Sequence, residues 1–345
     1  MSVVKKDAVA TGETVGAQTV QMKAIAQERY GPPESLRLID TEIPEIGSGE
    51  VLVKIHAAAV NPYDWHMLRG DPRIARLMGI GLIRPKARIA GVDVAGRVEA
   101  VGADVHGLHR GDEVFGTCRG AFAEYAVADA NLLVPKPAGL SFEQAAALPM
   151  AAVTALHAIR DVGHVQPGQR VLVIGAGGGV GTFAVQIAVA LGAEVTGVCS
   201  GRNIDLVRSL GASHVVDYSS EDFVDGPGRF DVILDNVGNR SIRDLRRAVT
   251  PTGTVILNGG GSPGRVIGAV GGLLRAAVIN LFVSQKITFV PTTQSRDDLL
   301  AVTELVESGA LRPVIDRRFP LVDTASALKY VEAGHTRGKV VIAVT

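Results

Sequence analysis

The chain has 345 residues, and its 35 Lys plus Arg are balanced by 35 Asp plus Glu. This length is sufficient for two domains with their own cores, and the balanced charge gives no basic surplus for binding nucleic acid. The composition, with 41 glycines, 47% hydrophobic residues and only 4% aromatic ones, is typical of an α/β protein. Cys118 and Cys199 have no CxxC spacing, which indicates reduced thiols in a cytoplasmic protein rather than a disulfide.

Residues 1–21 are mostly small and polar, and we expect them to form a flexible N-terminal tail. They lack the apolar core of a signal peptide, and their acidic residues argue against a transit peptide. The most apolar window is 266–283, but Arg275, Asn280 and several glycines interrupt it. We therefore expect no membrane span in this window.

From residue 22 to residue 148 the pattern predicts a compact antiparallel barrel of short strands. Apolar runs such as MKAIAQ and VLVKIHAAAV alternate with turn-rich separators such as YGPPES and EIGSGE. Further short strands are punctuated by glycine, as in GVDVAGRVEAVG and GDEVFG. These features are typical of an all-β domain that closes on itself.

Residues 149–311 predict a second domain, in which strands and helices alternate around a parallel sheet. The order strand, glycine loop, helix, turn and strand is predicted for the stretch RVLVIGAGGGVGTFAVQIAVALGAEVTGVCS. The helix is indicated by apolar residues at helical spacing, namely Val180, Phe183, Ala184, Ile187, Ala188 and Leu191. We expect the C-terminal segment 312–345, which ends in GKVVIAV, to return to the first domain.

The glycine loop AGGGVG, Ala176 to Gly181, follows a strand and opens a helix. This is the context of a dinucleotide-binding loop, with Gly178 and Gly181 in the second and third glycine places. The second glycine admits the pyrophosphate, the third permits close packing of helix and strand, and the helix N-terminus attracts anions. We expect Gly177, Gly178, Gly179 and Val180 to contact the cofactor.

About twenty residues beyond this loop, the sequence places Ser200, Gly201 and Arg202 where NAD-dependent proteins often have an acid. Ser200 could bond the 2′-phosphate of NADP, Arg202 could add a charge-assisted bond, and Tyr218 could contact the same end of the cofactor. This predicts NADPH rather than NADH. Alternatively, Arg202 is a solvated loop residue and Asn203 caps the next helix.

Several motifs together resemble the medium-chain dehydrogenase/reductase superfamily. They include VNPYDWHMLRG, GVDVAGRVEAVG, GAFAEYAV, GAGGGVGTFAVQIA and GHTRGKVVI. Within the superfamily they are similar to the zinc-independent quinone oxidoreductase branch, from residue 22 to the C-terminus. The resemblance implies a GroES-like β-barrel domain followed by a Rossmann domain with a doubly wound parallel sheet. It also implies a homo-oligomer.

Zinc alcohol dehydrogenases of the superfamily carry a cysteine and a GHE motif in the first domain. Here Asn61 stands at the place of the cysteine, Val92 at that of the histidine and Asp93 at that of the glutamate. Catalytic zinc takes about three protein ligands, and Asn61 and Val92 are not ligands of that kind. His66 is nearby, but a lone histidine is more often structural, so we expect no metal site.

Without a metal, hydride transfer needs an acceptor such as a quinone or an α,β-unsaturated carbonyl. The resemblance places Asn61 and Tyr63 beside the substrate as hydrogen-bond donors, although Asn61 could be a turn residue before Pro62 and Tyr63 a partly buried ring. It also places further residues beside the cofactor: Asn236, Val237, Gly259, His335, Thr336 and Arg337. The alternative for the last three is a solvated turn between Gly334 and Gly338.

The apolar segment 266–283 follows the expected nicotinamide side of the sheet. It is predicted either to line a site for a small lipophilic acceptor or to belong to the core or a subunit interface. The sequence thus favours an NADPH-dependent quinone or enone reductase. A pathway-specific enoyl or enone reductase would have the same sequence features, and a protein that binds NADPH without turnover is the alternative outside enzymes.

Overall fold

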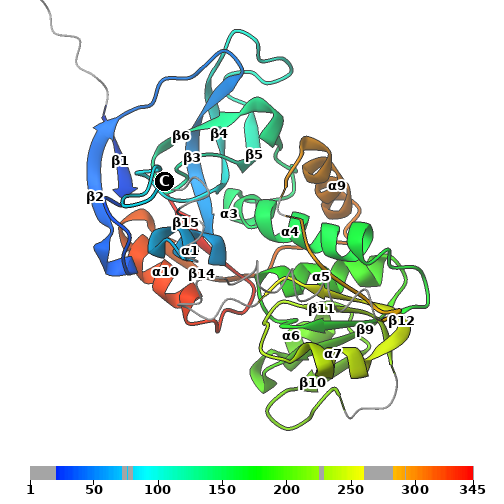
Figure 1. Cartoon of the computed structure of the whole chain (residues 1–345). Helices are drawn as coiled ribbons and strands as arrows, with labels where there is room; N and C mark the ends of the chain where they lie inside the picture. The colour runs from blue at the N-terminus through cyan, green and yellow to red at the C-terminus, as the bar shows by residue number, and fades with distance from the viewer. Residues whose placement is uncertain are drawn as a thin grey trace, which may run out of the picture.

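The computed structural model describes residues 21–71, 76, 81–224, 229–259, 283–291 and 293–344. Figure 1 shows a first lobe rich in strands and a second lobe in which helices pack on a sheet. The predicted tail, except residue 21, and the apolar segment 266–283, except residue 283, lie outside the described residues.

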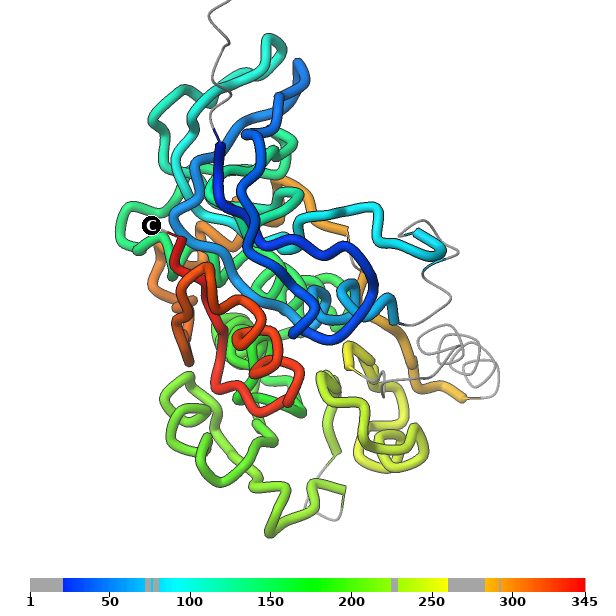
Figure 2. Tube along the Cα trace, turned by 90° about the vertical axis from the view of Figure 1, so that its left-hand side faces the viewer, coloured from blue at the N-terminus to red at the C-terminus, as the bar shows by residue number. Residues whose placement is uncertain are grey.

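The first lobe is built on a sheet of seven strands. In spatial order they are β14 (Ile315–Pro320), β15 (Lys339–Ala343), β3 (Glu50–Val60), β4 (Asp93–Val101), β5 (Glu113–Thr117) and β7 (Leu133–Pro135), with β6 (Tyr125–Asp129) also paired to β3. A separate antiparallel pair is formed by β1 (Gln21–Ala26) and β2 (Arg37–Glu42). The last strand therefore lies against β3, and Figure 2 shows the C-terminal segment running beside the first lobe.

One pairing of this sheet departs from the expected antiparallel pattern. β14 and β15 are parallel, whereas β15 and β3 are antiparallel. The reason is the crossover between them, which contains the helix α10 (Thr324–Glu332). Parallel neighbours need such a crossover, since a tight hairpin can join only antiparallel strands.

The second lobe is built on a six-stranded sheet whose pairings are all parallel, which confirms the predicted Rossmann-type sheet. Its order is β10 (His214–Asp217), β9 (Glu194–Cys199), β8 (Arg170–Ile174), β11 (Phe230–Asp235), β12 (Val249–Leu257) and β13 (Lys286–Phe289). The helices that connect these strands include α5 (Gly179–Ala190), α6 (Ile204–Ser209) and α7 (Ile242–Ala248). The helix predicted after the glycine loop is thus confirmed, because α5 spans that stretch.

The apolar runs of the parallel strands follow from burial on both faces of the sheet. In β8, Val171 and Val173 belong to the core that includes Phe183 of α5. The alternate residues of that strand, Leu172 and Ile174, belong to a second core that includes Leu245 of α7. Because successive side chains of a strand point to opposite faces, a strand covered on both sides must be apolar throughout.

The two lobes share further helices. They are α1 (Pro62–Arg69), α3 (Phe142–Ala146), α4 (Pro149–Leu156), the π-helix η4 (His157–Val162) and α9 (Arg296–Glu307). Short 3-10 turns complete the described elements: η1 (Pro33–Ser35), η3 (Ala130–Leu132), η5 (Gly201–Asn203) and η6 (Leu321–Asp323). One core contains both Ala57 of β3 and Val171 of β8, so apolar packing is continuous between the lobes. Among the described residues, every helix is too short or too polar to cross a membrane.

Candidate functional site

The glycine loop joins β8 to α5 at the carboxyl edge of the parallel sheet. A Cβ atom added at Gly181 would lie 2.1 Å from the carbonyl oxygen of Gly175, so only glycine fits at this crossing of helix and strand. At Gly178, which caps α5, the nearest atom would be 3.4 Å away, and the space in front of it is open. The first N–H groups of a helix have no partners within it, so this opening can receive a phosphate.

Asn203 lies directly against this loop. A Cβ atom at Gly177 would be 2.5 Å from Nδ2 of Asn203, whose side chain is buried. Asn203 stands at the N-cap position of α6, but it makes no side-chain capping hydrogen bond, so the capping alternative is wrong. Its Oδ1 atom is buried and has no partner among the described residues, which leaves an acceptor available beside the loop.

The three residues expected near the adenosine end come together where β9 and β10 end. Ser200 follows β9 directly, and the Tyr218 N–H donates to the carbonyl oxygen of Cys199 at 3.2 Å. Tyr218 is 55% exposed, so its ring is free to contact a ligand. The guanidinium of Arg202 is exposed and donates to the carbonyl oxygen of His335.

Asp217 joins this group, although the sequence analysis did not single it out. Its carboxylate accepts hydrogen bonds from the N–H of Ser219 at 3.0 Å and from its hydroxyl at 2.8 Å. These bonds hold the pKa of Asp217 below its usual value. A Cβ atom at Gly201 would lie 2.6 Å from this carboxylate, so a negative charge stands close to Arg202.

Asn236, Val237 and Gly259 come together at the ends of β11 and β12. Asn236 donates from Nδ2 to the carbonyl oxygen of Ile174 at 3.1 Å, and its Oδ1 accepts from Asn258 at 2.8 Å. The Gly259 N–H donates to the carbonyl oxygen of Asp235 at 3.0 Å. Val237 is 45% exposed and presents an apolar surface at this edge.

Asp235 is a further residue at this edge that the sequence analysis missed. Its Oδ1 accepts the N–H groups of Val237 and Gly238, both at 2.9 Å. Its Oδ2 atom is buried and has no partner among the described residues. Burial raises the pKa of Asp235, and the two N–H bonds oppose that rise.

The C-terminal turn that contains His335, Thr336 and Arg337 lies across the glycine loop. The Gly338 N–H donates to the carbonyl oxygen of Gly177 at 2.9 Å, and Gly178 and Gly338 form a parallel bridge. The N–H of Arg337 donates to Asp316 at 2.8 Å. His335 and Arg337 are exposed and Thr336 is half-buried, so their side chains stand at the rim of the loop.

Asn61 belongs to a buried polar cluster with Asp64, Asp93 and Lys339. Its Nδ2 donates to Oδ2 of Asp93 at 2.9 Å, and its Oδ1 accepts a hydrogen bond from the Lys339 ammonium. The ammonium lies 3.6 Å from Oδ2 of Asp93. All four side chains are at most 3% exposed. Asn61 is therefore more than a turn residue, because its carboxamide joins two buried charges.

Burial shapes the acid–base behaviour of the cluster. It raises the pKa of Asp64 to about 7, while the N–H of Asn61, which donates to Asp64 at 2.7 Å, opposes that rise. Burial also raises the pKa of Asp93 and lowers that of Lys339, and the opposite charge of each partner counteracts both shifts. Burial in low-dielectric surroundings disfavours every charged form. The charged state of the ammonium is therefore stabilised by the carboxylates, and the charged state of the carboxylates by the ammonium.

Tyr63 occupies the second position of α1, next to Asp64. Its ring is 45% exposed. Burial, with a contribution from the charge of Asp64, raises the pKa of its phenol. The phenol thus stays protonated at neutral pH and can donate a hydrogen bond to a ligand.

Within the buried cluster, the sequence carries a recognisable pattern for Asn61 and Asp64 but none for the contact that Lys339 makes. Asn61 and Asp64 form a capping box at the start of α1, and an Asn followed three residues later by an acid is a visible pattern. Lys339 is a charged residue directly before the apolar run VVIAV. Its contact with Asn61 spans 278 residues, which no local pattern reveals.

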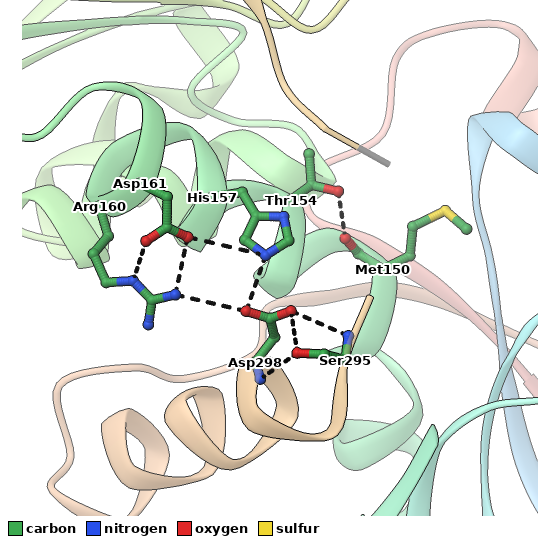
Figure 3. Close-up of polar contacts among 7 residues, drawn as sticks. All are labelled: Met150, Thr154, His157, Arg160, Asp161, Ser295 and Asp298. Carbon is green, nitrogen blue, oxygen red and sulfur yellow. Dashed lines mark hydrogen bonds and ion pairs between the residues drawn. The ribbon is translucent and has the colours of Figure 1, made fainter. Parts of the chain in front are cut away.

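A second polar cluster lies between α4–η4 and α9. Figure 3 shows His157 and Asp161 facing Asp298, with Nε2 of His157 2.9 Å from Oδ1 of Asp298. Three possible ligand atoms here lie within 4.8 Å of one another. Arg160 contacts both carboxylates, however, at 2.6 Å from Asp161 and 3.6 Å from Asp298. The cluster is therefore an ion-pair network that ties the helices together.

Comparison with known proteins agrees with this fold. Residues 47–138 match the family described as alcohol dehydrogenase GroES-like domain, and residues 210–342 match the one described as zinc-binding dehydrogenase. These domains define the class as the medium-chain dehydrogenase/reductase superfamily. Within it, the chain belongs to the quinone oxidoreductase branch.

Individual relatives cover nearly the whole chain. A mouse (Mus musculus) protein named "NAD(P)H oxidoreductase RTN4IP1, mitochondrial" is 35% identical over 95% of this chain and 91% of its own length. The tomato (Solanum lycopersicum) "2-methylene-furan-3-one reductase" is 34% identical over 93% of this chain and 79% of its own. The solved structure of the quinone oxidoreductase from Coxiella burnetii superposes with a TM-score of 0.81 at 30% identity, covering 94% of this chain and all of that one.

Proposed function

We propose that this protein is an NADPH-dependent oxidoreductase that delivers a hydride to quinones or α,β-unsaturated carbonyls without a metal. The observation that carries the proposal is the position of the Asn61–Asp93–Lys339 cluster directly beside the glycine loop. The loop supplies a phosphate site, and the cluster supplies hydrogen-bond donors instead of metal ligands. The names of the mouse and tomato relatives, an NAD(P)H oxidoreductase and an enone reductase, support the same class of reaction.

The side chains at the place of the zinc ligands do not fit a zinc ion. Oδ1 of Asn61 already accepts from an ammonium, and Asp93 is already balanced by Lys339. Val92 offers no donor atom, whereas zinc takes three or four N, O or S ligands. Within the described part of the chain, the one cluster with metal-ligand spacing is that of His157, Asp161 and Asp298, and there the Arg160 guanidinium already contacts both carboxylates.

NADPH is proposed over NADH because of the residues at the end of β9. Ser200 can donate a hydroxyl hydrogen bond to a 2′-phosphate, and Arg202 is an exposed guanidinium next to it. Asp217 adds a negative charge at the same place and works against the phosphate. We infer that Arg202 leaves the carbonyl oxygen of His335 to pair with the phosphate, and that this pairing outweighs the charge of Asp217.

Bound NADPH supplies the hydride, and the chain's own residues orient the acceptor and stabilise the charge that develops on its oxygen. An amide nitrogen carries two hydrogens, and Asp93 takes one of those of Asn61. The second hydrogen and the protonated phenol of Tyr63 are the proposed donors to the acceptor oxygen. Val237 offers an apolar contact at the same sheet edge.

The test is an acceptor panel with purified protein. NADPH oxidation is followed in absorbance with quinones, enones and simple ketones, NADH is run in parallel, and bound metal is measured by elemental analysis. We expect oxidation of NADPH with quinones or enones, slow or absent reaction with simple ketones, and no stoichiometric zinc. Stoichiometric zinc, or tighter binding of NADH than of NADPH in calorimetry, would refute the proposal.

The same panel separates the alternatives. Turnover with a single class of enoyl or enone substrate would identify a pathway-specific reductase. NADPH binding without oxidation by any acceptor would identify a cofactor-binding protein. A homo-oligomer and a cytoplasmic location stay predictions, to be checked by light scattering and by imaging of a tagged protein, since the relatives' names include mitochondrial and chloroplastic ones.

A further inference from the structure

A buried lysine lies between the glycine loop and Asn61. Lys339 is 3% exposed, and its ammonium contacts the Asn61 carboxamide and the Asp93 carboxylate. Asp93 is itself held by the N–H of Met150, at 3.1 Å, near the start of α4. Burying an ammonium is costly, and a buried ion pair is weak support for stability by itself. Its place beside the proposed reaction centre suggests a specific role.

Lys339 also touches the glycine loop. A Cβ atom at Gly179 would lie 3.2 Å from Cδ of Lys339, so the stem of the lysine runs along the first residue of α5. The preceding residue, Gly338, donates its N–H to the carbonyl oxygen of Gly177. Gly338 has a φ of 92°, and a Cβ there would be 2.4 Å from the carbonyl oxygen of Val314. The backbone is thus fixed where it directs Lys339 inward.

The contacts of Lys339 determine which way the Asn61 carboxamide faces. Its oxygen must face the ammonium, because an ammonium can only donate, and its nitrogen must face the carboxylate of Asp93, which can only accept. This arrangement leaves one N–H of Asn61 for a ligand. An ammonium on the amide oxygen also polarises the amide and strengthens that N–H as a donor.

We propose that Lys339 is a positioning residue, which fixes the Asn61 carboxamide relative to the glycine loop so that its second N–H meets the oxygen of the acceptor. The proposal rests on the proposed function for its consequence in catalysis, but the fixed carboxamide is a property of the protein alone. Lys339 acts through Asn61 and makes no contact with the acceptor.

The variants separate charge, position and packing. Lys339→Met keeps the length of the stem and removes the charge, but it leaves Asp93 buried without its ammonium. The double variant Asp93→Asn with Lys339→Met removes both charges, so that no unpaired carboxylate is left buried at position 93 to prevent folding. Lys329→Met is the matched control, because the side chain of Lys329 is 72% exposed and pairs with Glu34 on the surface. Asn61→Ala, alone and combined with the double variant, completes a double-mutant cycle that measures the coupling between Asn61 and the charged pair.

The first readout is independent of activity. In spectra of protein labelled with 15N at asparagine side chains, the Asn61 carboxamide is assigned by its absence in Asn61→Ala. In the wild type and in Lys329→Met we expect the two N–H protons of the Asn61 carboxamide to give widely separated signals that exchange slowly with solvent. In both Lys339 variants we expect fast exchange and a reduced separation. Unchanged signals in a folded Lys339 variant would overturn the proposal.

The second readout is kinetic. We expect both Lys339 variants to lower kcat about tenfold to a hundredfold, the scale of one hydrogen bond to a charged group, while the Kd for NADPH changes less than about threefold. Loss of Asn61 should cancel any further effect of the Lys339 change. A kcat within about twofold of the wild type, or effects that add to those of Asn61→Ala, would overturn the proposal. A wild type that reduces no acceptor would refute the proposed function, and the carboxamide spectra would still decide the role of Lys339.

Discussion

The buried carboxyl of Asp64 predicts a pH dependence of stability that a single substitution should remove. Asp64 is 2% exposed, and its Oδ2 accepts the N–H of Asn61 at 2.7 Å. Asp64→Asn keeps an oxygen acceptor for that N–H and cannot ionise. The difference between variant and wild type therefore reports the cost of the charge at this position.

The magnitude follows from the pKa of Asp64, which burial raises from 3.8 to about 7. The folded state then holds the proton more tightly than the unfolded chain, so stability falls as pH rises from the unfolded value through the folded one. The whole displacement corresponds to about 4 kcal/mol. Between about pH 6 and about pH 8 the free energy of unfolding should fall by roughly 1.4 kcal/mol through this group alone.

The assay is urea unfolding of the wild type and of Asp64→Asn at these two pH values. We expect the variant to gain roughly 1.4 kcal/mol relative to the wild type between about pH 6 and about pH 8. Asp205→Asn serves as control, because Asp205 is an exposed acid in the first turn of α6. A constant difference between Asp64→Asn and the wild type would show that Asp64 does not titrate between these pH values, which would contradict a folded-state pKa of about 7.

Further predictions concern the cofactor site. Arg202→Leu should raise the Kd for NADPH about tenfold and leave that for NADH unchanged in fluorescence titrations, and equal effects on both cofactors would contradict the role of Arg202. Asp217→Asn should lower the Kd for NADPH about two- to fivefold, since it removes a charge near the phosphate, and weaker binding would contradict this. Gly178→Ala should fold normally and bind NADPH at least tenfold more weakly, because its Cβ would enter the open space before α5. Gly181→Ala, whose Cβ would lie 2.1 Å from Gly175, should lower the melting temperature, and a Gly181→Ala protein as stable as Gly178→Ala would contradict the packing described here.

Local patterns made much of the second lobe predictable. The spacing of apolar residues after the glycine loop predicts α5. The glycine pattern of the loop predicts that Gly178 faces the cofactor and that Gly181 packs against the strand. Both features depend on residues close together in the chain, where helical periodicity and glycine geometry act directly. The same reasoning predicted the end of β9 at Ser200.

The site itself depended on contacts that local patterns do not encode. Lys339 meets Asn61 across 278 residues, and Asp217 approaches Gly201 only because β9 and β10 are neighbours in the sheet. The parallel pairing of β14 with β15 likewise follows from a crossover. Such contacts are set by the tertiary arrangement. The family resemblance therefore pointed to Asn61 and to the position of Asp93, but nothing in the sequence pointed to Lys339 as their partner.

The transfer of a hydride from NADPH to an electron-poor alkene can be followed directly with deuterium. NADPH deuterated at C4 on either face is oxidised by the protein with an α,β-unsaturated ketone, and the product is analysed by mass spectrometry and NMR. We expect one deuterium at the β-carbon of the saturated ketone from one of the two labelled cofactors. NADPH that binds and leaves the ketone unreduced, or a reduced product without deuterium from either cofactor, would contradict it.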